Sequence, residues 1–301
     1  MSREVQFQGQ RVIELQTGNS LLRVSPEKGG RLLMWEVSGK PVIHWPENAD
    51  WSNPPKIRGG NPILFPFIAR HFVDGQIGKW KDTAGVIRDL PMHGFARAAP
   101  FTVVDDDPST TRMRLVDNQD TQALYPYAFV FDVVYELDET SVRVVFETVN
   151  KGNERMPYYA GHHFYFPVPH DEREQWELHL IAEKWARQND DGSIVFSKPN
   201  DNILSLADPD LNDRMHILGG VGSVPNAELR KKDGSYKLLF DLATEGFPWY
   251  AVTTWTQTDS SDFYCVEPWL GLPNAIHHHY GLRWIEPGQK ETAGFTLRWL
   301  V

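Results

Sequence analysis

The most informative residue in this sequence is a carboxylate placed among apolar neighbours. Glu267 lies in FYCVEPWLG (residues 263–271), a stretch that is otherwise apolar or aromatic and has a proline directly after the glutamate. A carboxylate in such a stretch is not expected on a solvated face, so it either pairs with a base or is held for proton transfer. Removal from water would raise the pKa of its carboxyl group. Glu267 is therefore a candidate general acid or base.

Two other segments carry histidines that could complete an acid–base set. In YYAGHHFYF (residues 158–166), a strand would turn His162 and His163 to opposite faces, so at most one of them enters a given pocket. In PMHGFAR (residues 91–97), the glycine after His93 would let the backbone approach a ligand closely. Two imidazoles and a carboxylate make a plausible general acid–base set. On its own, His93 fits a structural hydrogen bond better.

Metal and nucleophile chemistry have weaker support. Adjacent histidines on a strand cannot converge on one metal ion, and the consecutive histidines at 277–279 match no ligand spacing. We therefore expect no metal site, and a loop near the site at 277–279. The acidic stretch DPDLNDR (residues 208–214) lacks the central glycine and final glutamate of a calcium-binding loop. Cys265 would share a strand face with Glu267, but a free cysteine in an apolar run is usually an inert core residue.

The overall composition argues against several classes of partner. The 301-residue chain has 40 acidic and 30 basic residues and a net charge of −10, which does not suit a surface that holds nucleic-acid phosphates. The N-terminus does not look like a signal peptide, and no apolar run approaches the roughly 18 to 20 residues that cross a bilayer. A single cysteine allows no internal disulfide. We expect a cytoplasmic protein that binds neither nucleic acid nor membrane.

The scaffold that would position these residues is predicted to consist of β-strands. FVFDVVYEL (residues 129–137) and SVRVVFETV (residues 141–149) both show alternation with period two, and three polar residues join them as a hairpin. Similar strand patterns occur at residues 21–25, 31–37, 111–117, 176–182, 236–242, 249–255 and 294–300.

The spacing of these strands predicts the fold class. Turn-forming stretches separate the strands, and the best helical candidate is the short DTQALY before Pro126. This pattern indicates an all-β fold, a large antiparallel β-sandwich with few short helices, in a single domain spanning residues 1–301. Residues 45–93 are poor in strand pattern and rich in glycine, proline, arginine and aromatic residues. We predict that they form the wall of a functional site.

Several segments then resemble, in their order along the chain, those of one known family. They are RGGNPILFPFIARHF (residues 58–72), LPMHGFAR (90–97), ALYPYAFVF (123–131), GHHFYF (161–166), CVEPWLGLPNA (265–275) and IEPGQ (285–289). Over roughly residues 20 to 300 the chain resembles the aldose 1-epimerase (galactose mutarotase-like) family. The resemblance implies a large antiparallel β-supersandwich, in agreement with the strand pattern.

The resemblance also implies catalytic roles. The late-strand glutamate that serves the family as base matches Glu267, and the histidine of its G-x-H-x-Y-F motif, the acid, matches His163 rather than His162. The histidine of its H-G-F motif matches His93 and would hydrogen-bond the sugar oxygens around C1. The implied reaction is proton shuttling that opens and closes the sugar ring without metal or cofactor. Glu267 would begin as carboxylate and His163 as imidazolium, with coupled titrations.

Substrate-binding residues follow from the same resemblance. Arg70 matches an arginine that binds sugar hydroxyls, and Asp213 is the preferred match for a substrate-binding aspartate, with Asp210 and Asp208 as rivals. Arg58 and Arg97 are candidate ligands for a phosphate or for hydroxyls.

Departures from the family pattern leave the substrate open. GHHFYF has Phe164 where the family often has proline, and ARHF replaces the more usual Gly-Arg or Asn-Arg. We predict an aldose 1-epimerase, monomeric or homodimeric, that acts on a sugar or a sugar phosphate. The alternatives are a hexose-6-phosphate 1-epimerase, a non-catalytic carbohydrate-binding protein on the same fold and, with less support, a polysaccharide lyase or hydrolase.

Overall fold

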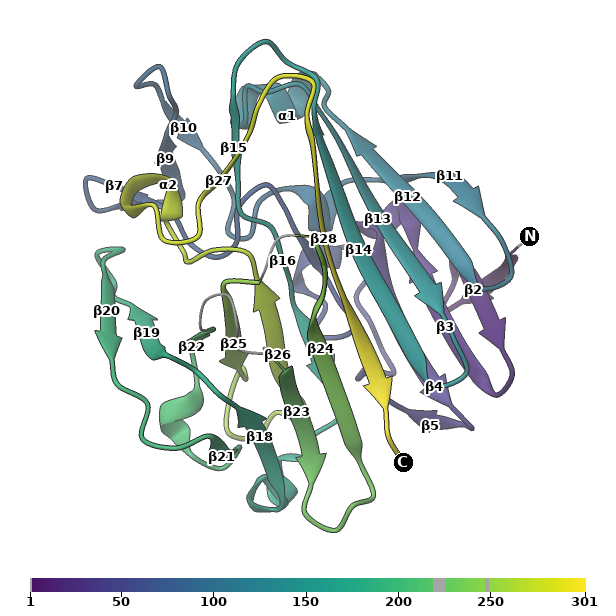
Figure 1. The fold of residues 1–301 in the computed structure, drawn as a ribbon. Helices are drawn as coiled ribbons and strands as arrows, with labels where there is room; N and C mark the ends of the chain where they lie inside the picture. The colour runs from purple at the N-terminus through teal and green to yellow at the C-terminus, as the bar shows by residue number, and fades with distance from the viewer. Residues whose placement is uncertain (1, 219–225, 247–248) are drawn as a thin grey trace.

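The computed structural model describes residues 2–218, 226–246 and 249–301, and over these ranges the named strands pair antiparallel (Figure 1). A nine-stranded sheet crosses the molecule. In spatial order its strands are β11 (Thr102–Asp106), β12 (Thr110–Val116), β13 (Phe129–Leu137), β14 (Ser141–Asn150), β28 (Lys290–Trp299), β24 (Lys237–Gly246), β23 (Asn226–Lys231), β18 (Trp176–Leu180) and β21 (Ile203–Ser205).

An eight-stranded sheet forms a second layer, with β17 (Phe164–Phe166) paired to β26 beside the main path. Its other strands, in spatial order, are β20 (Ile194–Ser197), β19 (Lys184–Gln188), β22 (Arg214–Ile217), β25 (Ala251–Trp255), β26 (Tyr264–Trp269), β16 (Gly161–His162) and β6 (Ile63–Leu64).

A five-stranded sheet is built from the N-terminal part of the chain: β1 (Arg3–Phe7), β2 (Gln10–Thr17), β3 (Ser20–Ser25), β4 (Arg31–Val37) and β5 (Lys40–Pro41). Three two-stranded sheets pair β7 (Phe72–Val73) with β8 (Gln76–Ile77), β9 (Lys79–Lys81) with β10 (Ile87–Asp89), and β15 (Met156–Tyr158) with β27 (Arg283–Ile285). The α-helices of the described residues are short: α1 (Gln119–Leu124) and α2 (Ala275–His278).

The two large sheets pack through aromatic side chains. Phe146 on β14 stacks on the ring of His162 on β16, with 4.2 Å between ring centroids, and Phe295 on β28 lies 5.8 Å from Phe164 on β17. All four side chains are buried in or beside one continuous apolar core. His162 and Phe164 therefore face the nine-stranded sheet. Alternation along the same segment turns His163 and Tyr165 to the opposite face.

The predicted all-β antiparallel sandwich is confirmed. The predicted hairpin is present as β13 and β14, paired from Phe129 opposite Asn150 to Leu137 opposite Val142, and the predicted helix before Pro126 is α1. The strands β1 and β2 were not predicted from the sequence. YYAGHHFYF contains the end of β15 together with β16 and β17, rather than one strand, because residues 159–160 and His163 lie outside these strands.

The loop predicted at 277–279 is wrong in part, since His277 and His278 belong to α2. Asn274 and His279 take left-handed conformations at its two ends, with φ of 66° and 69°, and the amide of His279 donates to the carbonyl of Ala275. These two residues confine the helix to a single turn.

Although residues 45–93 are poor in strand pattern, they contain the short strands β6 to β10. No helix of the described residues is long and apolar enough to span a membrane.

Candidate active site

A row of side chains crosses the eight-stranded sheet on the face turned away from the nine-stranded sheet. Thr253 on β25 pairs directly with Glu267 on β26, and Met215 on β22 pairs with Thr253. On the other side of β26, Phe164 pairs with Val266, which brings the preceding residue, His163, beside Glu267. The sheet register therefore places the acid–base candidates in one row, although they lie about a hundred positions apart in the sequence.

This row forms the floor of a cavity of about 280 Å³. The cavity is lined by Arg58, Ala69, Arg70, Met92, His93, Arg97, His163, Gln188, Asp213, Met215, Thr253, Trp255, Glu267, Trp269 and Pro273. All seven residues singled out for a site in the sequence are among them. Residues 45–93 contribute five of the lining residues, so this segment does form a wall of the cavity.

The side chains of His163 and Glu267 approach closely without forming a hydrogen bond. His163 Nδ1 lies 3.5 Å from Glu267 Oε1, and neither His163 Nδ1 nor Glu267 Oε2 has a hydrogen-bond partner among the described residues. Glu267 is 1% exposed and His163 is 7% exposed. A proton donor and a proton acceptor thus lie together in a site that excludes most water.

The electrostatics of this pair differ from the expected starting state. Burial, together with the negative charge of Asp213, raises the pKa of the Glu267 carboxyl well above its usual range. Burial, together with the positive charges of Arg97 and Arg58, lowers the pKa of His163 well below its usual range. In the free protein both groups therefore favour the neutral form, with the single proton of the pair on Glu267. This differs from the predicted state, with His163 as imidazolium, because the sequence does not show that Arg97 and Arg58 lie close to His163.

Asn61 fixes the positions of both consecutive histidines. Its side-chain oxygen accepts from the amide of His163 at 2.9 Å, and its Nδ2 lies 2.9 Å from His162 Nδ1. Trp269 Nε1 donates to the carbonyl of His162. Because Asn61 is fully buried, this clamp is shielded from water and holds the His163 backbone beside β26.

His93 is held by two hydrogen bonds to a single neighbour. Its amide donates to the carbonyl of Ala69, and the amide of Ala69 donates to His93 Nδ1 at 3.0 Å. Burial lowers the pKa of His93 well below its usual range, so the ring is neutral and Nε2 carries the proton. The rings of His93 and His163 are 5.4 Å apart. His93 can therefore offer a hydrogen-bond donor close to the acid–base pair.

The charged residues around the cavity are mostly cationic. Arg58, Arg70 and Arg97 have no ion-pair partner within 4.0 Å among the described residues, although Asp213 lies close enough to Arg70 for their charges to interact. Arg58 donates to the Gln257 side chain and lies over the Trp255 ring.

The competing aspartates are separated by their exposure to the cavity. Of the three candidates, only Asp213 is among the residues that line the cavity. The side chain of Asp208 instead accepts a hydrogen bond from the Asp210 amide and caps the 3-10 turn Pro209–Leu211. The side chain of Asp210 is 82% exposed.

Several lining residues were not identified from the sequence. Thr253 and Met215 pair across neighbouring strands and therefore face the cavity together. The side-chain nitrogen of Gln188 donates to the carbonyl of Arg70, so the side-chain oxygen of Gln188 is left for a ligand. The alternation of WYAVTTW, read together with that of the strand carrying Glu267, could have suggested Thr253 and Trp255. Their proximity to Glu267 depends on pairing that the sequence does not show.

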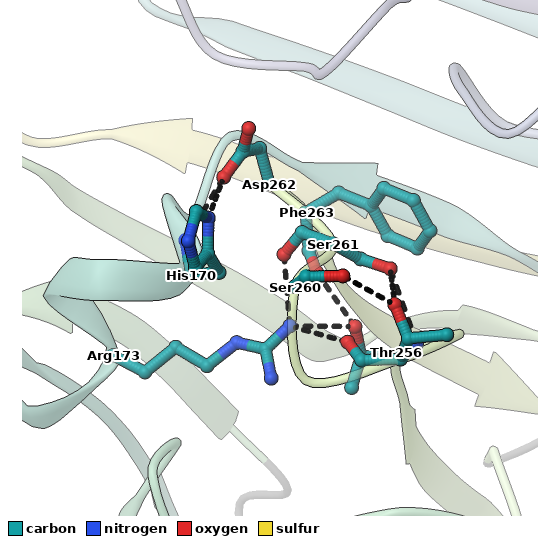
Figure 2. Close-up of polar contacts among 8 residues, drawn as sticks. His170, Arg173, Thr256, Ser260, Ser261, Asp262 and Phe263 are labelled. Carbon is teal, nitrogen blue, oxygen red and sulfur yellow. Dashed lines mark hydrogen bonds and ion pairs between the residues drawn. The ribbon is translucent and has the colours of Figure 1, made fainter.

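The loop of residues 256–263, which joins β25 to β26, is held from below by an arginine (Figure 2). Arg173 Nη2 donates to Thr256 Oγ1 and to the carbonyls of Thr258 and Ser261. This buried guanidinium fixes the loop between the strands that carry Thr253 and Glu267. The neighbouring His170–Asp262 pair in the same view is exposed to solvent.

Comparisons with known proteins agree with this fold. The sequence model of the family Aldose 1-epimerase matches residues 11–218. Protein LacX of Lactococcus lactis subsp. lactis is 27% identical over 247 residues, which cover 75% of this chain and 79% of LacX. An Escherichia coli (strain K12) protein named "Putative glucose-6-phosphate 1-epimerase" is 26% identical over 118 residues, or 38% of this chain and 35% of that protein.

Among solved structures, the galactose mutarotase related enzyme from Lactobacillus acidophilus has a TM-score of 0.81 at 22% identity, covering 96% of this chain and 97% of that one. This likeness extends over all three large sheets and therefore over the strands that carry the cavity. The match to more than half of the chain by the family model shows that this protein belongs to the aldose 1-epimerase family.

Proposed function

We propose that this protein is an aldose 1-epimerase that interconverts the α and β anomers of a sugar. One observation carries the proposal. A buried imidazole and a buried carboxyl group lie 3.5 Å apart, without a hydrogen bond between them, in a cavity that also contains His93, Arg70 and Asp213. A binding protein has no need for an unpaired acid and base, because each costs stability when it is buried.

The proposed reaction moves one proton in each direction. Glu267 as carboxylate takes the proton from the anomeric hydroxyl, while His163 as imidazolium gives a proton to the ring oxygen. The bond between C1 and the ring oxygen breaks and the C1 carbonyl forms. After rotation about C1–C2, the ring closes on the other carbonyl face, and the two groups exchange roles. Nε2–H of His93 donates to the oxygen at C1 as charge develops there.

Substrate binding would prepare the pair for this reaction. The neutral pair of the free protein and the reactive ion pair contain the same number of protons, so only a shift from Glu267 to His163 separates them. Sugar hydroxyls that donate to the Glu267 carboxylate would replace the water it lost on burial. We therefore expect the ion pair to form when the sugar is bound, which confines the costly charged state to the complex.

Anomer-exchange NMR on glucose and galactose tests this proposal. E267Q and H163Q should each lower kcat by about two to four orders of magnitude, the range typical of a positioned acid or base. H170Q, in the exposed pair with Asp262, is the matched control and should keep the wild-type rate. Full activity in E267Q or H163Q would contradict the mechanism. Tight sugar binding with exchange no faster than buffer would instead indicate a carbohydrate-binding protein.

A sugar phosphate is the second candidate substrate, favoured by the unpaired arginines. Arg58 and Arg97 border the cavity without a carboxylate partner among the described residues. Burial lowers the pKa of Arg97, and the positive charge of Arg58 lowers it further. Guanidinium groups bind phosphate through paired hydrogen bonds, and a phosphate would offset this uncompensated charge. The similarity to the E. coli protein named above supports the same substrate class.

A direct comparison separates the two substrates. If the natural substrate is a sugar phosphate, glucose 6-phosphate should have a higher kcat/KM than glucose. R97Q should then raise the KM for glucose 6-phosphate by about tenfold or more and leave the KM for glucose nearly unchanged. Equal effects of R97Q on both sugars would assign the arginine to hydroxyl binding.

A further inference from the structure

The cysteine of this chain lies behind the acid–base pair, in a position the proposed reaction does not use. Cys265 is fully buried and does not line the cavity. It shares a face of β26 with Glu267, two residues away, and pairs with Tyr165 on β17, whose ring stacks on His163 at 4.9 Å. The donor atoms of His163, Cys265 and Glu267 all lie within 4.8 Å of one another.

We propose that His163, Cys265 and Glu267 form a binding site for a zinc-type divalent cation, which occupies the acid–base pair and reversibly blocks it. The ion would be an inhibitor rather than a cofactor, because it takes the two groups that the proposed reaction needs free. The inhibitory part of this proposal rests on the proposed function, whereas the binding part does not.

The geometry of the pair already suits such an ion. Zinc binds nitrogen and oxygen at about 2.0–2.1 Å and sulfur at about 2.3 Å in a tetrahedron, so neighbouring ligand atoms are roughly 3.3–3.6 Å apart. The separation of 3.5 Å between His163 Nδ1 and Glu267 Oε1 matches that spacing. Since the three donor atoms lie within 4.8 Å of one another, the sulfur needs to move inward by at most roughly 1.2–1.5 Å to reach this spacing.

The ligand atoms are also free to bind. His163 Nδ1 and the second carboxyl oxygen of Glu267, Oε2, are buried and have no hydrogen-bond partner among the described residues, so an ion held by these two atoms displaces no hydrogen bond of either. Each is a polar atom that burial leaves unsatisfied, and coordination would satisfy both. Three protein ligands leave a fourth position, and His163 and Glu267 open that position toward the cavity for water or a sugar oxygen.

The chemistry of the donors selects the type of cation. One nitrogen, one sulfur and one carboxylate oxygen suit zinc, cobalt and cadmium, whereas magnesium and calcium prefer sets of six or more oxygens. Glu267 is protonated in the free protein, so binding releases two protons to solvent, one from the Cys265 thiol and one from the Glu267 carboxyl group. The resulting thiolate and carboxylate together balance the two positive charges. The nearby Arg58 and Arg97 oppose cation entry, and we therefore expect reversible binding rather than a permanent structural ion.

Cobalt(II) is the probe for binding, since its thiolate complexes absorb by charge transfer. The whole chain contains one cysteine, so any thiolate-to-cobalt absorption belongs to Cys265. We expect this absorption at one cobalt per chain in the full-length protein, its loss on adding zinc, and no change with magnesium. H163Q, which keeps the thiol, should weaken cobalt binding by about 10-fold or more, and H170Q should not. Absence of the absorption, or unchanged binding in H163Q, would overturn the proposed site.

Inhibition is tested separately on the exchange rate. Zinc should slow anomer exchange, and a chelator should restore it. In C265S, measured relative to its own metal-free rate, the inhibitory zinc concentration should rise by about 10-fold or more. C265A serves as a second variant if C265S fails to fold. Inhibition that is unchanged in these variants would exclude Cys265 as a ligand. If the protein shows no exchange at all, the proposed function fails, and the cobalt experiment still decides the metal site.

Discussion

At the scale of single residues, the proposed chemistry depends on a carboxyl group that its surroundings keep protonated. Glu267 is nearly inaccessible, has an oxygen without a partner among the described residues, and experiences the negative charge of Asp213. These features make ionisation costly in the free protein. A buried carboxylate that functions in a bound complex is expected to reduce the stability of the free protein, a common conflict between activity and stability.

Replacing this carboxyl group should therefore stabilise the protein while it removes activity. The folded-state pKa of Glu267 lies above the unfolded value, so its contribution to stability is present below about pH 4.5 and is lost as pH rises through the folded-state pKa. E267Q does not titrate. Its free energy of unfolding should exceed that of the wild type by a margin that grows from pH 5 to pH 8, reaching about 1–3 kcal/mol.

Urea denaturation of both proteins at each pH measures this margin, and the contributions of groups that do not interact with Glu267 cancel in the difference. A margin that shrinks with rising pH would show that Glu267 is held as a stabilised carboxylate. That result would also assign the resting proton of the pair to His163.

At the scale of elements, the turn that carries His93 depends on one glycine. Gly94 has φ of 72°, and a Cβ atom there would lie 2.1 Å from the carbonyl oxygen of Phe65. The same turn holds His93 against Ala69 through two hydrogen bonds. The close approach of two backbones is what brings this histidine to the cavity.

G94A should therefore be much more damaging than alanine at a comparable glycine. Gly75 has φ of 75° with open space around it, so G75A should cost only the left-handed penalty of roughly 1–2 kcal/mol. G94A adds a backbone clash and should cost several kcal/mol or prevent folding, and it should lower kcat through His93. Chemical denaturation compares the two variants. Equal losses of stability would show that the turn can relax.

The hairpin of β25 and β26 depends in the same way on the buried arginine beneath its loop (Figure 2). R173K keeps the charge, but its shorter side chain leaves the ammonium short of the position from which Nη2 donates to Thr256, Thr258 and Ser261. We expect a stability loss of about 1.5–3 kcal/mol, faster amide exchange in residues 256–263 and a lower kcat.

Its control is H170A, which removes the exposed ion pair with Asp262 and should cost less than about 1 kcal/mol. Hydrogen exchange followed by mass spectrometry makes the comparison. Unchanged exchange in the loop of R173K would mean that the strands alone fix its position.

At the scale of the whole molecule, five buried histidines make the fold sensitive to acid. Burial lowers the pKa of His71 and His216 to about 3, and it lowers those of His93, His162 and His163 well below the usual range. In the unfolded chain each would titrate near pH 6.5. Their contribution to stability is therefore present above about pH 6.5 and is lost as pH falls toward the folded-state values.

We expect the free energy of unfolding to fall between pH 6.5 and pH 4.5, by up to about 1.4 kcal/mol per pH unit for each histidine that stays neutral in the fold. H216Q keeps a polar group near Thr254 Oγ1, the partner of His216, and should reduce this slope by about 1 kcal/mol per pH unit. Denaturation curves at several pH values test both statements. Equal stability at pH 6.5 and pH 4.5 would show that these histidines ionise within the folded protein.

Much of the architecture and the composition of the site could be predicted. The alternation in residues 129–149 predicted the hairpin of β13 and β14, and the apolar surroundings of Glu267 correctly predicted its burial and the direction of its pKa. His162 and His163 do face opposite sides of the sheet, as predicted, although β16 ends at His162 and His163 lies between β16 and β17. The roles proposed for His163, His93 and Arg70 came from family resemblance and stay predictions.

Other features were beyond sequence reasoning for a physical reason. Alternation is a local property of an extended chain, so the sequence by itself determined the strands, the fold class and the burial of a carboxylate. Only the tertiary structure decided that Thr253 and His163 lie on either side of Glu267, because strand pairing joins residues far apart in the chain. It also decided the resting protonation, since the pKa of each group depends on lost water and on arginines brought from distant segments.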